Sequence, residues 1–454
     1  GRGGLSHTLE HMLYKGTATI GTRDGTKEAQ LRAEREAAEA EQKSLSATGA
    51  QGVAEKEERR ATLEARIHEL DQQERALWVT NELDLIYGRA GATALNAVTN
   101  PDSTAFFVSL PANKLELWFW MESDRLREPV FRDLAGEKQA IEAERQEALE
   151  GRGRFADEMR AFFWQGGSYG VPDLGTPEDV AGITAADAAK HFQTFYGAGN
   201  LTAVLVGHLD HQKVRELAER YFGRLPASPA PARPWQEPAP QTAERRRQVS
   251  YPGAPAVEIL YRTVPFLAPD SYALEVAAGV LNARLYTSVV LTSPLVSSAS
   301  AEQSSLKRGG FFTLSLEGTS TADPAMLEKT AAEKLAELAA HPVPEEELAA
   351  VKDRLTAQAY RQRIDPVSLL VQILEDAGMG DGTYVNSSAA HLKAVTAADI
   401  QRVAATYFRP ENRTVETYVP GPPDQPGQPS PSASPGSSGG TVGTGGSGDS
   451  GARP

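Results

Sequence analysis

The sequence contains no cysteine, which excludes a disulfide framework, a thiol nucleophile and a thiolate metal site. Any zinc bound by this chain must therefore use nitrogen and oxygen ligands. No run of apolar residues approaches the roughly 20 residues that a membrane-spanning helix needs, so we expect no transmembrane segment. The lack of cysteine does not fix the compartment, and an extracytoplasmic or periplasmic location and a cytoplasmic one both stay open.

Positive charge is also scarce relative to negative charge. Lysine and arginine total 46 against 60 aspartates and glutamates, which gives a formal net charge of -14. This balance argues against nucleic acid or an anionic membrane surface as a partner, and it suits basic or unfolded substrates. With 454 residues, of which 40% are hydrophobic and 23% are charged, most of the chain is expected to fold as a soluble protein of two domains.

Only 8 histidines are present, and two of them stand four positions apart near the start of the chain. On a helix, His7 and His11 lie on one face with Glu10 beside them. Neutral imidazoles from one helical turn are suitable zinc ligands, and a neighbouring carboxylate can take a proton from water. The His-x-x-Glu-His spacing is that of the inverted zincin motif. The plain alternative is an amphipathic helix whose polar residues face solvent.

The residues around this motif carry a resemblance to a known family. The run Gly-Leu-Ser-His-Thr-Leu-Glu-His-Met-Leu-Tyr-Lys-Gly-Thr at residues 4–17 resembles the start of the insulinase-like (pitrilysin, processing-peptidase) zinc metallopeptidases. Thr8 stands where the family often has an aromatic residue. The resemblance implies an α+β fold of two tandem homologous domains, each an antiparallel sheet with helices packed on one face. It also implies one Zn²⁺ per chain, with His7 and His11 as ligands and Glu10 as the catalytic base.

A third zinc ligand is needed, and carboxylate is the remaining hard choice in a chain without cysteine. Several glutamates between residues 137 and 150 compete for this role. In the family the ligand follows another functional glutamate by seven residues on the same helix, and Glu137 and Glu144 have this spacing of about two turns. The resemblance therefore implies Glu144 as the ligand and Glu137 as a supporting catalytic residue. A solvated acidic helix is the plain alternative.

An insertion explains the long interval between His11 and Glu144. From about residue 27 to 78 the composition shifts to Ala, Glu, Arg, Gln and Leu around a Gly-containing break at 46–52, which predicts a helical hairpin. A surface for a partner subunit or a substrate gate is one interpretation. We favour a solvated insertion, since long surface insertions cost little closure entropy.

Two β-rich runs on either side of residues 100–102 predict a β-hairpin. Asn96-Ala97-x-Thr99 is similar to the family's substrate-side edge strand, where a peptide adds by main-chain hydrogen bonding. The resemblance therefore implies that Asn96 and Ala97 bind substrate beside the scissile bond. As plain sequence, these residues predict only a strand.

A repeat at an offset of 212 residues divides the chain. Thr184-Ala185-Ala186-Asp187 recurs as Thr396-Ala397-Ala398-Asp399, and Thr194, Asn200 and Thr202 recur as Thr406, Asn412 and Thr414. We expect a catalytic domain over residues 1–225 that lacks its N-terminal strands and has a strand at 201–206. A Pro-rich linker at 226–248, a homologous domain without a metal motif at 249–419 and a disordered Pro/Gly/Ser tail at 420–454 complete the expected organisation.

The second domain departs from the family pattern. Family members often supply an Arg and a Tyr to the substrate from this domain, where the resemblance places Val290 and Ser297. The resemblance still implies a zinc-dependent metalloendopeptidase that hydrolyses peptide bonds in short or unfolded polypeptides. It also implies a homodimer, or a heterodimer with a homologous subunit. The alternatives are a zinc-bearing subunit active only when paired and a non-catalytic scaffold of the same fold.

A second metal site is the weaker interpretation of the remaining histidines. His208 and His211 are three residues apart with Asp210 between them. A loop pair of this kind without a third distant ligand is more often solvated, so we assign no metal there.

Overall fold

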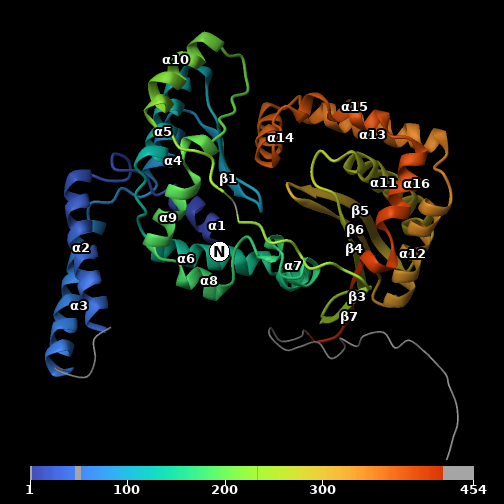
Figure 1. The fold of residues 1–454 in the computed structure, drawn as a ribbon, viewed down its shortest axis with the longest axis horizontal. Coiled ribbons are helices and arrows are strands. Elements are labelled where there is room, and N and C mark those ends of the chain that lie inside the picture. Colours follow the sequence, from blue (N-terminus) through green and yellow to red (C-terminus); the bar gives the residue numbers. More distant parts are fainter. Residues whose placement is uncertain (1–2, 47–52, 233, 423–454) are drawn as a thin grey trace, which may run out of the picture.

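The computed structural model describes residues 3–46, 53–232 and 234–422. Residues 47–52 of the expected hairpin break lie outside this part of the chain, as do residues 423–454 of the expected tail. Figure 1 shows two lobes of helices and strands side by side, and the helix α7 (Ala156–Trp164) lies between them. Among the described residues, no helix combines the length and the apolar character needed to cross a membrane.

The first lobe is largely helical. Its strands β1 (Thr93–Thr99) and β2 (Thr104–Ser109) form a two-stranded antiparallel sheet. Besides α7, its helices are α1 (Leu5–Met12), α2 (Gly25–Ser46), α3 (Val53–Arg75), α4 (Glu82–Arg89), α5 (Leu115–Arg127), α6 (Leu134–Ala148), α8 (Pro177–Gly182), α9 (Ala185–Phe195) and α10 (His211–Tyr221).

The second lobe is built on a five-stranded sheet of order β3-β7-β4-β6-β5. The pairing is antiparallel except between β3 and β7, which run parallel. Its strands are β3 (Arg245–Tyr251), β4 (Ala256–Thr263), β5 (Val296–Leu306), β6 (Gly309–Gly318) and β7 (Arg413–Pro420). Its helices are α11 (Pro269–Leu285), α12 (Pro324–Ala340), α13 (Glu345–Gln362), α14 (Pro366–Met379), α15 (Ser388–Ala394) and α16 (Ala397–Tyr407).

Alternation along the strands gives this sheet two apolar faces. Ile259 and Phe312 point into the main core, where α11, α12 and α16 pack. Their neighbours Leu260 and Phe311 point to the opposite face and pack against Phe163 of α7. Since successive side chains of a strand alternate between faces, one sheet can bury its own helices on one side and the first lobe on the other. The predicted α+β class is confirmed.

The two lobes repeat the same local structure. Thr184 and Thr396 each begin a helix by a capping box, accepting a hydrogen bond from the backbone N–H of the aspartate three residues later. At the other end, Asn200 Nδ2 donates to Phe195 O at 2.8 Å, and Asn412 Nδ2 donates to Tyr407 O at 2.9 Å. The sequence repeat therefore corresponds to a helix that occurs in both lobes, as α9 in the first and α16 in the second.

The duplication fails at the next element. After Asn412 the chain enters β7, which pairs with β3 and β4, but residues 201–206 form no strand. The expected strand at 201–206 is wrong for this structure. A strand needs a hydrogen-bonded neighbour, and none of the described strands lies against this segment.

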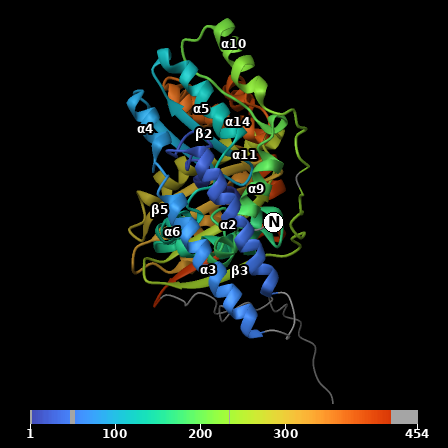
Figure 2. The ribbon, with the colours of Figure 1, turned by 90° about the vertical axis from the view of Figure 1, so that its left-hand side faces the viewer.

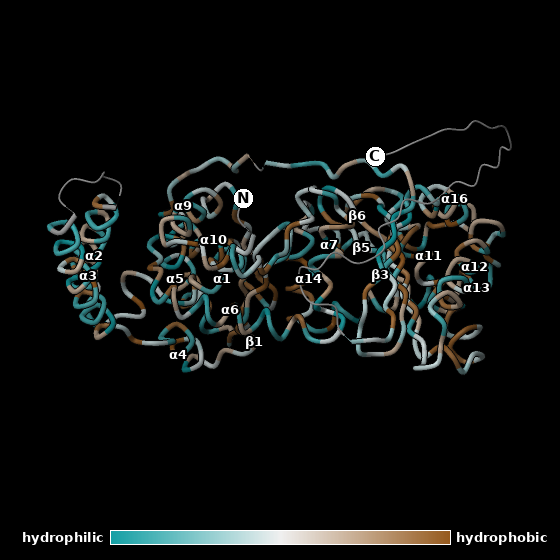
Figure 3. The backbone as a smooth tube through the Cα atoms, turned by 90° about the horizontal axis from the view of Figure 1, so that it is seen from below, coloured by the Kyte–Doolittle hydropathy of each residue, from teal (hydrophilic) through white to brown (hydrophobic). Residues whose placement is uncertain are grey.

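Two long helices occupy the segment expected to be a helical hairpin. Figure 2 looks onto α2 and α3, which run side by side away from the first lobe. Leu31, Leu63 and Leu70 are buried, whereas many of the residues along α2 and α3 are coloured as hydrophilic in Figure 3. The narrow apolar stripe joins the two helices without building a further core.

Candidate metal centre

Helix α1 carries the predicted motif and is enclosed by the first lobe. It packs against α6, α9 and β1, and Leu9 and Met12 are fully buried on its apolar side. Gly4 precedes the helix with φ +72°, and a Cβ at this position would lie 2.5 Å from the carbonyl oxygen of Leu174. Only glycine fits so close an approach with a left-handed backbone, so the start of α1 is fixed in place.

Three side chains converge where α1 faces α6. His7 Nε2 lies 3.5 Å from Glu144 Oε2, and His11 Nε2 lies 3.4 Å from the same oxygen. Within the described residues, His7, His11 and Glu144 form the one group of three metal-binding side chains whose ligand atoms all lie within 4.8 Å of one another. Tetrahedral zinc with bonds of about 2.0–2.2 Å separates its ligand atoms by roughly 3.3–3.6 Å. Two imidazoles and one carboxylate at these spacings therefore fit zinc.

Glu137 supports one of the two histidines. Its Oε2 accepts a hydrogen bond from His11 Nδ1 at 3.0 Å, and its other oxygen pairs with the ammonium of Lys15. This hydrogen bond raises the pKa of His11, against the opposing effect of burial. Burial would raise the pKa of Glu137 itself, but the hydrogen bonds from His11 and Lys15 outweigh it and lower that pKa. A carboxylate behind a histidine fixes the ring orientation and leaves Nε2 free for a metal.

His7 lies in a different environment. Its ring is buried, and its Nδ1 has no hydrogen-bond partner within the described part of the chain. Burial lowers the pKa of His7, the nearby Glu144 carboxylate opposes this, and His11 adds to the lowering. A lowered pKa favours the neutral imidazole, which is the form that binds metal.

Glu10 stands on α1 beside the two histidines, close enough for the charges of His11 and Glu144 to act on it. Its residue is 8% exposed, and its Oε2 accepts a hydrogen bond from Thr99 Oγ1 at 2.5 Å. Burial raises the pKa of Glu10, although the hydrogen bond from Thr99 acts in the opposite direction. A carboxyl group with a raised pKa is a stronger base when ionised, which suits proton transfer.

The predicted substrate residues lie on β1, next to α1. Asn96 is exposed and Ala97 is partly buried, and they pair with Phe107 and Phe106 of β2. No other described strand covers the outer edge of β1. This edge therefore has no strand partner among the described residues, and neither residue contacts the three candidate ligands through a described hydrogen bond.

The weaker histidine pair does not gather a metal site. Asp210 caps α10, and its Oδ1 accepts hydrogen bonds from the backbone N–H groups of Gln212 and Lys213. Within the described residues, His208 and His211 join no cluster of three metal-binding side chains. The carboxylate between them has a structural role at a helix start.

The sequence reasoning missed Lys15, and it did not assign a role to Thr99. Lys15 lies four residues after His11, one turn further along the direction of α1, so helical spacing could have placed it beside Glu137.

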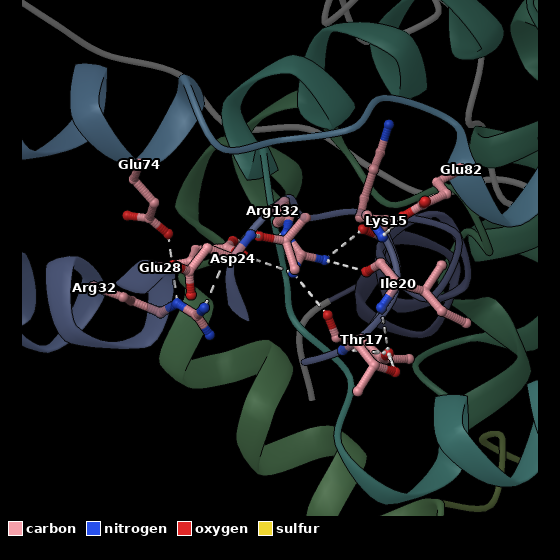
Figure 4. Close-up of polar contacts among 12 residues, drawn as sticks. Lys15, Thr17, Ile20, Asp24, Glu28, Arg32, Glu74, Glu82 and Arg132 are labelled. Atoms are coloured by element: carbon pink, nitrogen blue, oxygen red, sulfur yellow. Dashed lines mark hydrogen bonds and ion pairs between the residues drawn. The ribbon is translucent and has the colours of Figure 1, made fainter. Parts of the chain in front are cut away.

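The sequence reasoning missed Arg132 as well. Figure 4 shows its guanidinium between Glu28 and the backbone just after α1. Arg132 donates to the Glu28 carboxylate at 2.6 and 2.8 Å and to the carbonyl oxygens of Lys15, Thr17 and Ile20. This contact ties the base of α2 to the end of the motif helix.

Comparisons with known proteins agree with this fold. The family model described as "Peptidase M16 inactive domain" matches residues 182–355. The mitochondrial-processing peptidase subunit beta of Lentinula edodes is 29% identical over 140 residues, which are 30% of this chain and 30% of that relative. The chain thus matches less than a third of the relative's length.

Two solved structures have the same architecture. A protease from Helicobacter pylori superposes with a TM-score of 0.70 at 20% identity, over 75% of this chain and 85% of that chain. A peptidase M16 inactive domain from Pseudomonas fluorescens superposes with a TM-score of 0.69 at 17% identity, over 94% and 90%. At these identities, the likeness establishes the fold alone.

The duplicated lobes define the chain as a protein of the M16 peptidase fold. The matched domain model and the processing-peptidase relative support the resemblance to the insulinase/pitrilysin-like peptidase family that the residues around His7 and His11 carry.

Proposed function

We propose that this chain is a zinc-dependent metalloendopeptidase that hydrolyses peptide bonds by a glutamate-activated water. The observation that carries the proposal is the convergence of His7, His11 and Glu144, with the buried Glu10 on the helix of the two histidines. Residues 1–225 would be the catalytic domain and residues 249–419 its homologous cover. The matched family model is described as an inactive domain and lies largely in the second of these, which supports this division of roles.

Each side chain has a separate task in this mechanism. His7, His11 and Glu144 would hold the metal, and Glu137 would keep the His11 ring in its binding orientation. Zinc, when bound, supplies Lewis acidity that polarises a peptide carbonyl and makes water a stronger acid. Glu10 takes a proton from the attacking water and passes it to the leaving nitrogen, so its carboxylate acts first as base and then as acid.

Substitution of the base tests this assignment. In Glu10→Gln the amide keeps the shape of the side chain but cannot accept the proton, so peptide hydrolysis should fall by at least about 100-fold. Zinc content should stay at one ion per chain, because Glu10 is not among the three candidate ligands. The measurement is metal analysis together with hydrolysis of a labelled peptide. Retained turnover in this variant would remove the mechanism.

The substrate class follows from the open edge of β1. A peptide that adds there by main-chain hydrogen bonds must be extended, and a segment inside a folded protein is not free to pair. We therefore propose short or unfolded polypeptides as substrates, bound beside Asn96 and Ala97. A labelled peptide should be cleaved faster than the same segment within its folded parent protein, and equal rates would contradict this substrate class.

A second candidate function is a subunit that is active only when paired. Val290 ends a π-helical turn (Tyr286–Val290) and packs partly against the core, and the Ser297 hydroxyl donates to Glu317 O at 3.1 Å. Neither side chain offers the guanidinium or phenol expected at these positions. The test is peptide hydrolysis by the purified chain with and without a homologous subunit. Activity only in the mixture would favour the paired form, and full activity alone would exclude it.

A further inference from the structure

The carboxylate of Glu10 is held by a residue that lies 89 positions away in the sequence. Thr99 is the last residue of β1, and its hydroxyl donates to Glu10 Oε2 at 2.5 Å. The torsion that turns a glutamate carboxylate is broad, so an unheld carboxylate samples many orientations. A hydrogen bond to one oxygen selects one orientation and leaves the other oxygen, Oε1, available to a water molecule.

A second hydroxyl fixes the direction of this hydrogen bond. Thr99 is paired across the sheet with Thr104, and their Oγ1 atoms are 3.1 Å apart. A hydroxyl has one proton to donate, and an ionised carboxylate can only accept. Thr99 therefore donates to Glu10 and accepts from Thr104. Hydrogen bonds in such a chain polarise and strengthen one another.

The backbone that carries Thr99 is itself anchored at the contact between the lobes. Asn100 Oδ1 accepts from the backbone N–H of Asp102 at 2.9 Å, which closes the turn after β1. Asp102 in turn accepts from the Tyr169 hydroxyl at 3.0 Å and from the backbone N–H of Lys307, at the tip of the β5–β6 hairpin, at 2.9 Å. The position of Thr99 thus depends on contacts with the second lobe as well as on β2.

We propose that Thr99 is a positioning residue that orients the Glu10 carboxylate for proton transfer. The inference rests on the proposed peptidase function and deepens it, since it assigns the second lobe an indirect part in holding the base. Thr99 is suited to this task because its β-branched side chain has few rotamers. The hydroxyl comes from β1, whereas the candidate ligand Glu144 is on α6.

The kinetic test compares three substitutions in zinc-loaded protein. Thr99→Val keeps the shape and removes the hydroxyl, so kcat should fall about 10- to 100-fold while KM changes less than about twofold. Thr99→Ser restores the hydroxyl and should recover most of kcat. Thr93→Val is the matched control at the exposed start of β1, and it should behave as the unaltered protein. An unchanged kcat in Thr99→Val, or an equal loss in Thr93→Val, would overturn the proposal.

A structural test stands apart from turnover. Crystal structures of the zinc-loaded protein should show one ordered Glu10 carboxylate with Thr99 or with Thr99→Ser, and a displaced or multiply oriented one with Thr99→Val. The same single orientation in Thr99→Val would contradict the inference, whether or not the protein cleaves peptides. Absence of peptide hydrolysis by the zinc-loaded unaltered protein would instead count against the proposed function alone. Thr104→Val should give a smaller displacement of the carboxylate than Thr99→Val.

Discussion

The two lobes share a repeated helix with the same cap but are stabilised in different ways. The second lobe has one continuous apolar core between its five-stranded sheet and its helices, with Ile259, Phe312 and Leu314 fully buried. The first lobe has several small apolar clusters, such as the one around Leu9 and Met12. A large core can stabilise a lobe without polar help, whereas small clusters leave more of the stability to specific polar contacts.

Buried carboxylates show the same difference. Glu28 of the first lobe is fully buried and accepts hydrogen bonds from Nε and Nη2 of Arg132, at 2.6 and 2.8 Å. Asp376 of the second lobe is 5% exposed, and the charges that act on it, those of Glu375 and Asp381, are negative. Glu28 is linked through Arg132 to the backbone that follows α1, whereas Asp376 lies on α14 of the second lobe. The difference holds for this pair of carboxylates and not for every buried acid of the second lobe, since the fully buried Glu416 is paired with Arg247 at 3.1 Å.

Removal of the paired carboxylate should have the largest effect. Glu28→Ala leaves the Arg132 guanidinium buried with its carbonyl acceptors but without a counter-charge, which should cost about 3–5 kcal/mol of unfolding free energy. Urea denaturation of the metal-free chain measures this. Because Arg132 also binds the carbonyl oxygens after α1, zinc affinity should fall with stability.

A matched control lies on the same helix. Glu39 of α2 pairs with Arg35 at 2.7 Å, but its side chain is 45% exposed, so Glu39→Ala should cost less than about 1 kcal/mol. Equal losses in Glu28→Ala and Glu39→Ala would show that burial does not set the contribution of these ion pairs, and the contrast between the lobes would lose its basis.

Asp376 of the second lobe, which faces negative charges, gives a prediction of the opposite sign: its replacement should stabilise the chain, and the gain should depend on pH. Burial, with the nearby charges of Glu375 and Asp381, raises the pKa of Asp376 to about 7. Its protonated form therefore contributes stability that is present below about pH 4 and is lost as the pH rises through 7. Asp376→Asn mimics the protonated acid and should stabilise the chain by about 2–4 kcal/mol at pH 8.

The same substitution should have little effect at pH 4, where Asp376 is protonated in the folded chain and about half protonated in the unfolded chain. Thermal or urea unfolding of both proteins at pH 4 and pH 8 measures the difference. A gain of equal size at the two pH values would mean that packing, and not the charge of Asp376, is responsible.

Local periodicity explains which parts of the site could be predicted from the sequence. His7 and His11 are four residues apart and Glu137 and Glu144 are seven apart, so each pair had to share a helix face once the helices formed. The structure brings these two faces together, as the resemblance implies, and zinc binding itself stays a prediction. The capping boxes at Thr184 and Thr396 were visible as a repeat for the same reason, because three-residue spacing is local.

Local residue spacing could not predict contacts between elements that are distant in the sequence. Nothing near Glu28 or Arg132, 104 positions apart, signals that they meet, since this depends on how α2 leaves the first lobe. Thr99 likewise reaches Glu10 only because β1 packs on α1. The strand expected at residues 201–206 failed for a related reason: its pattern is local, but a strand requires a partner that the pattern does not specify. The domain boundaries also stay predictions.

The smallest expected effect concerns the carboxylate behind His11. Glu137→Gln keeps a hydrogen-bond acceptor for His11 Nδ1 but removes the negative charge that Lys15 also contacts, so zinc affinity should weaken about 10- to 100-fold. Competition with a metal chelator measures this ratio. Glu142→Gln on the same helix is the control, because its side chain contacts Gln146 and neither histidine. An equal change in both variants would mean that Glu137 acts through the general charge of α6, whereas a change confined to Glu137→Gln would show that the contact with His11 tunes the site.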